Sequence, residues 1–145
     1  MVSDVLNNRV LVVPSAIWVL AQCLKVVLHL FKERRLDLRY LTTAGGMPSS
    51  HSALVTSLAT AIAKVEGMGS PFFALAAVFA AVVMYDAAGV RRAVSVQARI
   101  LNRMLDELFQ RQSISEERLK EFIGHTPFEV LVGATMGIAL TLWWI

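Results

Sequence analysis

Charged residues and cysteine are both scarce in this chain. Asp, Glu, Lys and Arg make up 17% of the 145 residues, hydrophobic residues make up 56%, and the mean hydropathy is +0.58. Soluble domains usually have about 25% charged residues, so the composition excludes an ordinary soluble domain and indicates a membrane protein. Cys23 is the only cysteine, which excludes an intrachain disulfide.

Two kinds of motif are also missing. No small-residue cleavage site follows the first apolar stretch, so we expect a retained helix and not a removed signal peptide. The His, Cys and acidic residues match no strong metal motif, and we predict neither a metal nor a cofactor. The alternative, a metal site, would combine His51, Asp86, His125 and Glu129.

Apolar stretches fill most of the chain. The first, residues 10–31, would extend about 33 Å as a helix, enough to cross a bilayer core of about 30 Å. The second is richer in Ser, Thr and Ala, and would pack among other helices. In the last, Gly133 and Gly137 have a GxxxG spacing that allows close helix contact. We predict an all-α integral membrane bundle, one domain over residues 1–145, with about four spans at 10–31, 51–66, 71–88 and 127–145.

A charged segment separates the last two spans. In residues 91–124, charged side chains alternate with apolar ones, and Val96, Ile100 and Met104 recur at helical spacing. Residues 113–116 resemble a capping box that opens a second short helix. We therefore predict a helical hairpin insert over the membrane face.

Basic residues indicate the orientation. A basic run, Lys32 to Arg39, follows the first span, and Arg91 and Arg92 follow the third. The positive-inside rule places both on the cytoplasmic side, so the protein would be multi-pass with its polar clusters on the cytoplasmic face. The simplest reading of the basic run is a topology signal alone. Attraction to anionic lipid explains the net charge of +3 without nucleic acid.

The sequence GGMPSSHS, residues 45–52, opens the second apolar stretch. Its glycines and serines can bring backbone N–H groups close to phosphate oxygens. Ser49, Ser50 and the basic side chains Lys32, Arg39, Arg91 and Arg92 therefore indicate a phosphate ligand. Alternatively, Ser49 or Ser50 is an ordinary helix cap and His51 a helix-start histidine that bonds to backbone.

His125 and Glu129 are four residues apart, so on a helix they share a face. A carboxylate there can orient an imidazole, which can then attack phosphorus, while His51 protonates the leaving oxygen and later activates water. The simpler alternative is a local i,i+4 pair. Lys25 and His29 lie one turn apart in the first span and could line the interior of the bundle. The alternative for Lys25 is that it snorkels or packs against a partner helix, and we interpret His29 as structural.

These motifs resemble the superfamily of type 2 phosphatidic acid phosphatases and vanadium haloperoxidases, in its small divergent membrane branch. The family elements are KxxxxxxRP, PSGH and SRxxxxxHxxxD. Lys32 to Arg39 has the first spacing, Pro48 to His51 resembles the second, and His125 to Glu129 the end of the third. The segment YDAAGVRR, residues 85–92, resembles one typical of the divergent branch.

The chain departs from the family pattern at four places. Tyr40 replaces the proline after the arginine, Ser50 replaces glycine, where it would crowd a bound phosphate, and Glu129 replaces aspartate. The charged insert separates Arg91 or Arg92 from His125, where the family has five residues.

The resemblance implies a role for each matching residue. His125 would be the nucleophile, Glu129 its orienting partner and His51 the acid and then the base. Phosphate would be bound by Lys32, Arg39, Ser49, Ser50 and either Arg91 or Arg92. No metal is implied for phosphatase chemistry.

Our leading hypothesis is an acid-phosphatase-like membrane enzyme that hydrolyses a phosphomonoester or diphosphate through a phosphohistidine. Its candidate substrates are a lipid phosphate and an isoprenoid diphosphate. The alternative is a catalytically silent membrane binding or scaffold protein that retains the phosphate-site framework. A third hypothesis, compatible with both, is a subunit of a homo-oligomer or larger assembly, because the GxxxG face and the insert offer contact surfaces.

Overall fold

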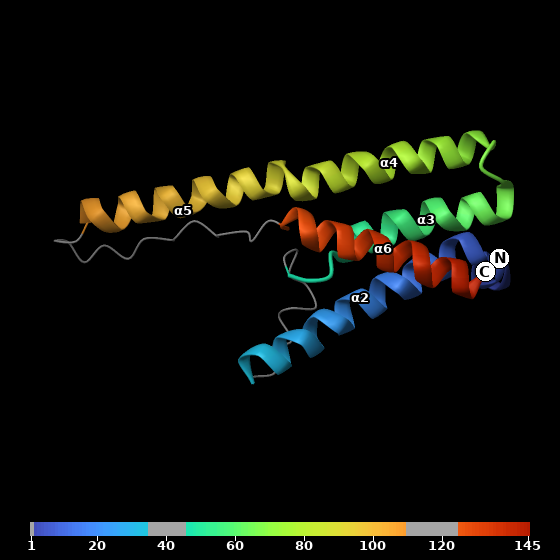
Figure 1. Ribbon diagram of the computed structural model, residues 1–145, viewed down its shortest axis with the longest axis horizontal. Helices are drawn as coiled ribbons and strands as arrows, with labels where there is room; N and C mark the ends of the chain where they lie inside the picture. Colours follow the sequence, from blue (N-terminus) through green and yellow to red (C-terminus); the bar gives the residue numbers. More distant parts are fainter. Residues whose placement is uncertain (1, 35–45, 110–124) are drawn as a thin grey trace.

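The structure is a computed structural model that describes residues 2–34, 46–109 and 125–145, and every regular element in these ranges is a helix (Figure 1). This confirms the all-α fold. The helices are α1 (Val2–Asn7), α2 (Arg9–Glu33), α3 (Ser50–Glu66), α4 (Pro71–Ala88), α5 (Val90–Phe109) and α6 (Pro127–Trp144).

Polar caps fix where the principal helices begin. Ser49, Ser70 and Thr126 are the N-caps of α3, α4 and α6, and each side-chain oxygen accepts a hydrogen bond from a backbone N–H of the first turn. Proline follows two of these caps, at Pro71 and Pro127, where its missing N–H costs least. These short signals explain where α3, α4 and α6 begin. Helices α2, α3, α4 and α6 begin and end within two residues of the predicted span ranges.

Three helices of the described chain are long and apolar enough to cross a membrane: α2 over Arg9–Phe31, α4 and α6. Helix α3, with 17 residues, is not among them. The fold is therefore that of an integral membrane helical bundle, and the fourth span stays a prediction.

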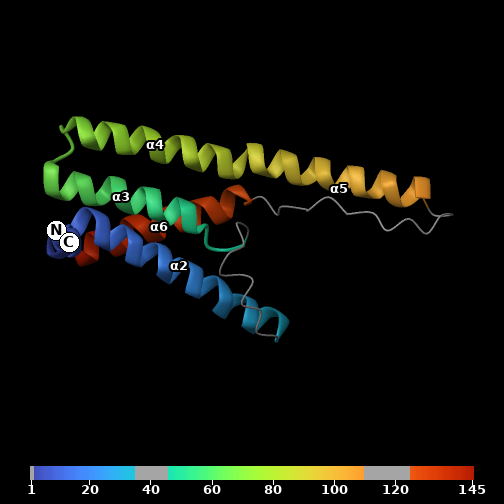
Figure 2. The same cartoon turned by 180° about the vertical axis from the view of Figure 1, so that it is seen from behind.

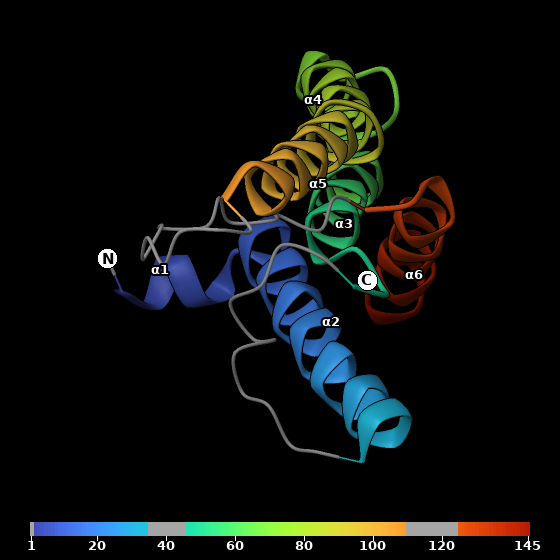
Figure 3. The ribbon, with the colours of Figure 1, turned by 90° about the vertical axis from the view of Figure 1, so that its left-hand side faces the viewer.

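Helix α3 lies at the centre of the bundle, in contact with α2, α4 and α6 (Figure 3). Its buried residues are almost all small, which lets neighbouring helices approach closely. Hydroxyl groups on this helix also bond to α6: Thr56 Oγ1 lies 3.2 Å from the carbonyl oxygen of Ala134, and Ser57 Oγ lies 2.6 Å from Thr141 Oγ1. A helix rich in Ser, Thr and Ala thus packs among other helices, as its composition predicts.

The GxxxG face of α6 packs against α3 of the same chain. A methyl group added at Gly133 would overlap the carbonyl oxygen of Ser49, and one at Gly137 would overlap Ala53 and Thr56. The glycines permit close helix contact, as predicted, but the contact is intramolecular. The two glycines therefore contact α3 within the chain, and a homo-oligomer stays a prediction.

The two ends of the bundle differ. The N-terminus, the C-terminus and the turn before α4 lie together at one end (Figures 1 and 2). The end of α2, the starts of α3 and α6 and the junction of α4 with α5 lie toward the other. Segments far apart in the sequence therefore reach the same end.

Helix α5 continues from α4 after Gly89 and extends beyond the bundle (Figure 1). Among the described elements it contacts α4 alone. The predicted insert is helical over its first part, whereas its predicted second helix, within residues 110–124, lies outside the described residues.

Candidate functional site

The PSSH corner is a buried turn joined to α6. Ser49, Ser50 and Ser52 are fully buried. The backbone N–H of Ser49 donates to the carbonyl oxygen of Glu129 at 3.1 Å, and Ser52 Oγ donates to Ser49 Oγ at 2.9 Å. Ser49 is indeed a helix cap, as the simpler interpretation predicts. The same bonds also hold the corner directly against the first turn of α6.

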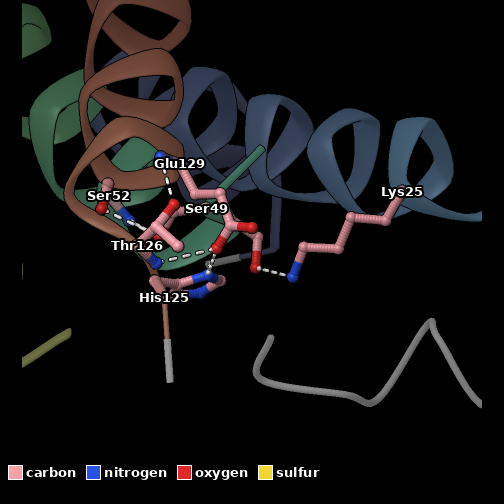
Figure 4. Close-up of polar contacts among 7 residues, drawn as sticks. Lys25, Ser49, Ser52, His125, Thr126 and Glu129 are labelled. Atoms are coloured by element: carbon pink, nitrogen blue, oxygen red, sulfur yellow. Dashed lines mark hydrogen bonds and ion pairs between the residues drawn. The ribbon is translucent and has the colours of Figure 1, made fainter. Parts of the chain in front are cut away.

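The carboxylate of Glu129 is fixed by a capping box. Its Oε2 accepts from the backbone N–H of Thr126 at 3.0 Å, while the Thr126 hydroxyl accepts from the backbone N–H of Glu129 at 3.3 Å. The same Oε2 lies 3.3 Å from Nδ1 of His125 (Figure 4). The side chain of Glu129 therefore both caps the start of α6 and orients the imidazole of His125.

His125 is only 2% exposed, and its two ring nitrogens have different surroundings. Nδ1 faces Glu129, whereas Nε2 is buried with no hydrogen-bond partner in the part of the chain that the structure describes. Buried polar atoms are normally paired, so an exception requires an explanation. The arrangement leaves Nε2 open to a ligand that enters the site.

Burial lowers the pKa of His125 below its ordinary value of 6.5. The hydrogen bond and charge of Glu129 raise this pKa, while the nearby Lys25 and His51 lower it. Near neutral pH the ring is thus neutral. If Nδ1 carries the proton and donates to Glu129, Nε2 has a free lone pair.

Lys25 is a site residue that the sequence interpretation missed. Its side chain is 2% exposed, and its Nζ donates to Ser50 Oγ at 3.1 Å across the α2–α3 contact (Figure 4). Lys25 therefore lies in the interior of the bundle, and its ammonium group is buried and does not snorkel. Lys25 lies eight residues before the end of the apolar helix α2. Its position indicates a functional site, because ionisable groups within spans usually mark functional sites.

The contact with Lys25 also bears on the departure at Ser50. The sequence pattern suggests that a serine in place of glycine would crowd a bound phosphate. In the structure its hydroxyl instead anchors the ammonium group of Lys25. Serine at this position thus places a positive charge at the corner.

Some predicted site residues come together and others lie outside the description. His125, Glu129, Ser49 and Ser50 converge, and His51, half-buried in the first turn of α3, is close enough for its charge to act on His125. Arg39 and the side chains of Lys32, Arg91 and Arg92 lie outside the described residues, so their role as phosphate ligands stays a prediction.

Asp86 lies in the last turn of α4 and is half-buried. No group of three or more His, Cys, Asp or Glu residues that could hold a metal ion occurs in residues 2–34, 46–109 and 125–145.

Comparison with known proteins gives two matches. The sequence model described as the Divergent PAP2 family matches residues 6–140. The chain is also 39% identical to the uncharacterized membrane protein YuiD of Bacillus subtilis (strain 168), over 96% of this chain and 95% of that protein. No solved structure matches the chain.

Proposed function

The chain belongs to the Divergent PAP2 family, and from that premise we propose that it is a membrane phosphatase acting through a phosphohistidine at His125. The observation that carries this proposal is the buried Nε2 of His125, which has no partner among the described residues while Nδ1 is held by Glu129. An imidazole oriented by a carboxylate at one nitrogen is activated at the other.

The reaction would proceed in two displacements. Nε2 of His125 attacks phosphorus, a P–N bond forms, and the bond from phosphorus to the leaving oxygen breaks while His51 gives that oxygen a proton. Neutral His51 then takes a proton from water, whose oxygen attacks phosphorus and breaks the P–N bond. Inorganic phosphate leaves, and both histidines return to their starting protonation states.

Lys25 supports this chemistry as a fixed positive charge. Its ammonium group is held at the corner by its bond to Ser50 Oγ. A positive charge at this position would stabilise the phosphate oxygens that become more negative in the transition state. Lys32, Arg39 and either Arg91 or Arg92 are proposed as further ligands.

The substrate is proposed to be a lipid phosphate or isoprenoid diphosphate that presents its head group from the cytoplasmic side. This is supported by the site's position at the end of apolar helices, where a phosphate and an acyl or prenyl chain can both be accommodated. A binding or scaffold protein is the second candidate, because Ser50 and Glu129 depart from the family pattern and Ser50 bonds to Lys25.

The test is phosphate release by the purified protein in lipid nanodiscs, with lipid phosphates, isoprenoid diphosphates and a soluble aryl phosphate. His125→Ala should abolish release, whereas His29→Ala, a histidine on α2 outside the site, should retain it. Equal release by wild type and His125→Ala would disprove the mechanism. Phosphate binding without release would assign the protein to the scaffold class.

A second arm tests the role of His51. The His51→Ala variant should still be phosphorylated by an aryl phosphate whose leaving group needs no proton. This variant should then accumulate as the phosphoprotein, because no His51 is present to take the proton from the attacking water. A phosphoprotein that forms equally in His125→Ala would contradict the assignment of the nucleophile.

A further inference from the structure

Helix α5 carries an apolar surface that no described element covers. It begins two residues after the end of α4 and contacts only that helix. The side chains of Val94, Ile100, Leu101 and Met104 are each about half exposed, between 46% and 54%. Such a surface in water is costly and requires a partner.

Most of the apolar side chains of α5 lie on one face. At 3.6 residues per turn, Ala93, Val94, Ala98, Ile100, Leu101 and Met104 occupy an arc of about 160°. Gln97 lies within this arc, and Val96, which is 45% exposed, lies about 40° beyond one edge of it. Arg99 and Arg103 project from the opposite arc. A two-stranded coiled coil needs only a narrow seam. An apolar face of nearly half the circumference instead fits the boundary of a bilayer.

The charges of α5 also favour a bilayer as the partner of this surface. The first four charged residues of α5 are all arginines, Arg91, Arg92, Arg99 and Arg103, and the two acidic residues, Asp106 and Glu107, follow in its last turn. Two parallel copies of this helix would bring like charges together, whereas the head groups of anionic lipids carry the opposite charge. Position agrees as well, because the span α4 delivers the first residue of α5 to a membrane surface.

We propose that α5 turns at Gly89 and lies along the surface of an anionic bilayer, with Ile100 and its apolar neighbours at the acyl boundary and Arg99 and Arg103 among the head-group phosphates. Gly89 separates the two helices, and glycine changes its backbone angles at little steric cost. This surface interaction is independent of catalysis at His125.

The test uses the full chain with Cys23→Ala and one spin label in nanodiscs that contain either phosphatidylglycerol with phosphatidylcholine or phosphatidylcholine alone. Labels are placed by Ile100→Cys on the apolar face and by Arg99→Cys on the opposite face. Val78→Cys, on the exposed side of α4, gives a reference for a label in lipid. Collision with oxygen reports lipid exposure, and collision with a water-soluble nickel chelate reports water exposure.

In phosphatidylglycerol the Ile100 label should resemble the Val78 reference, with rapid oxygen collisions and few nickel collisions, and the Arg99 label should show the reverse. The paired change Arg99→Glu and Arg103→Glu should return the Ile100 label to water. Three results would overturn the proposal: an Ile100 label in water, one sheltered from both reagents by protein, or one unaffected by lipid charge.

Discussion

At the scale of single residues, the site depends on two side chains near His125 and on the burial of its ring. Glu129 holds Nδ1, Lys25 supplies charge from another helix, and burial keeps the ring neutral. The i,i+4 spacing of His125 and Glu129 made their pairing predictable. The presence of Lys25 within an apolar helix indicated a functional position, but the sequence did not identify Ser50 as the residue that it contacts.

The acid limb of kcat/KM should lie below the ordinary histidine pKa. A neutral His125 is the nucleophile, and burial lowers its pKa below 6.5, so activity should be retained as pH falls to that value and lost only at lower pH. Glu129 raises this pKa, and Glu129→Gln should move the limb further down and reduce kcat on the order of 10²-fold. An upward shift would contradict the pairing.

Linkage gives the same histidine an effect on stability. The unfolded chain protonates His125 more readily than the folded chain does, because burial penalises the charged ring. This contribution to stability is therefore full above pH 6.5 and is lost as pH falls through the folded pKa. Thermal unfolding of His125→Asn should depend less on pH in that range than wild type.

Lys25→Met should weaken phosphate binding while the bundle stays folded. A hydrogen bond to a charged group contributes about 1.5–3 kcal/mol, so the Kd for orthovanadate should rise by roughly 10- to 100-fold. Methionine fills a similar volume without a buried charge. Thr135→Ala, on the exposed side of α6, is the control and should leave vanadate binding unchanged. Unchanged vanadate binding in Lys25→Met would remove the lysine from the site.

At the scale of elements, apolar stretches and caps made the helix positions predictable, but not which helix meets which. The GxxxG pattern predicts a close contact and does not identify its partner, which depends on the three-dimensional position of α3. Likewise, the periodicity of residues 96–104 predicts a helix but not its course in line with α4.

Gly133→Ala should separate α6 from the corner. The added methyl group would overlap the Ser49 carbonyl, and overpacking of this kind costs about 1–3 kcal/mol. Since Ser49 also bonds to Glu129, we expect both a lower unfolding temperature in detergent and reduced activity. Ile138→Ala, on the exposed side of α6, is the control and should change neither. Wild-type stability in Gly133→Ala would show that the contact is looser.

At the scale of the whole molecule, the positions of the helix ends put the polar clusters together. The corner, His125 and the α4–α5 junction lie toward one end, and both termini and the turn before α4 lie at the other. Counting helices from the sequence predicts this arrangement. The sidedness depends on arginines whose side chains lie outside the described residues.

Cysteine labelling in a Cys23→Ala background tests whether α3 crosses the membrane. Met47 and Met68 flank this helix and are both exposed. Met47→Cys should react with a membrane-impermeant reagent only from the cytoplasmic side, and Met68→Cys only from the opposite side. Reaction of both from one side would mean that α3 is not a span.

One carboxylate in this fold limits the substitutions open to the chain. Glu129 closes a capping box, faces a histidine and through its backbone carbonyl holds the start of α3. Aspartate, the residue of the wider superfamily pattern, is one methylene shorter, so its carboxylate would lie further from both the backbone N–H of Thr126 and Nδ1 of His125. The change Glu129→Asp would therefore weaken both contacts unless the neighbouring backbone moved with it. Glu129, Thr126 and His125 thus constrain one another's identity.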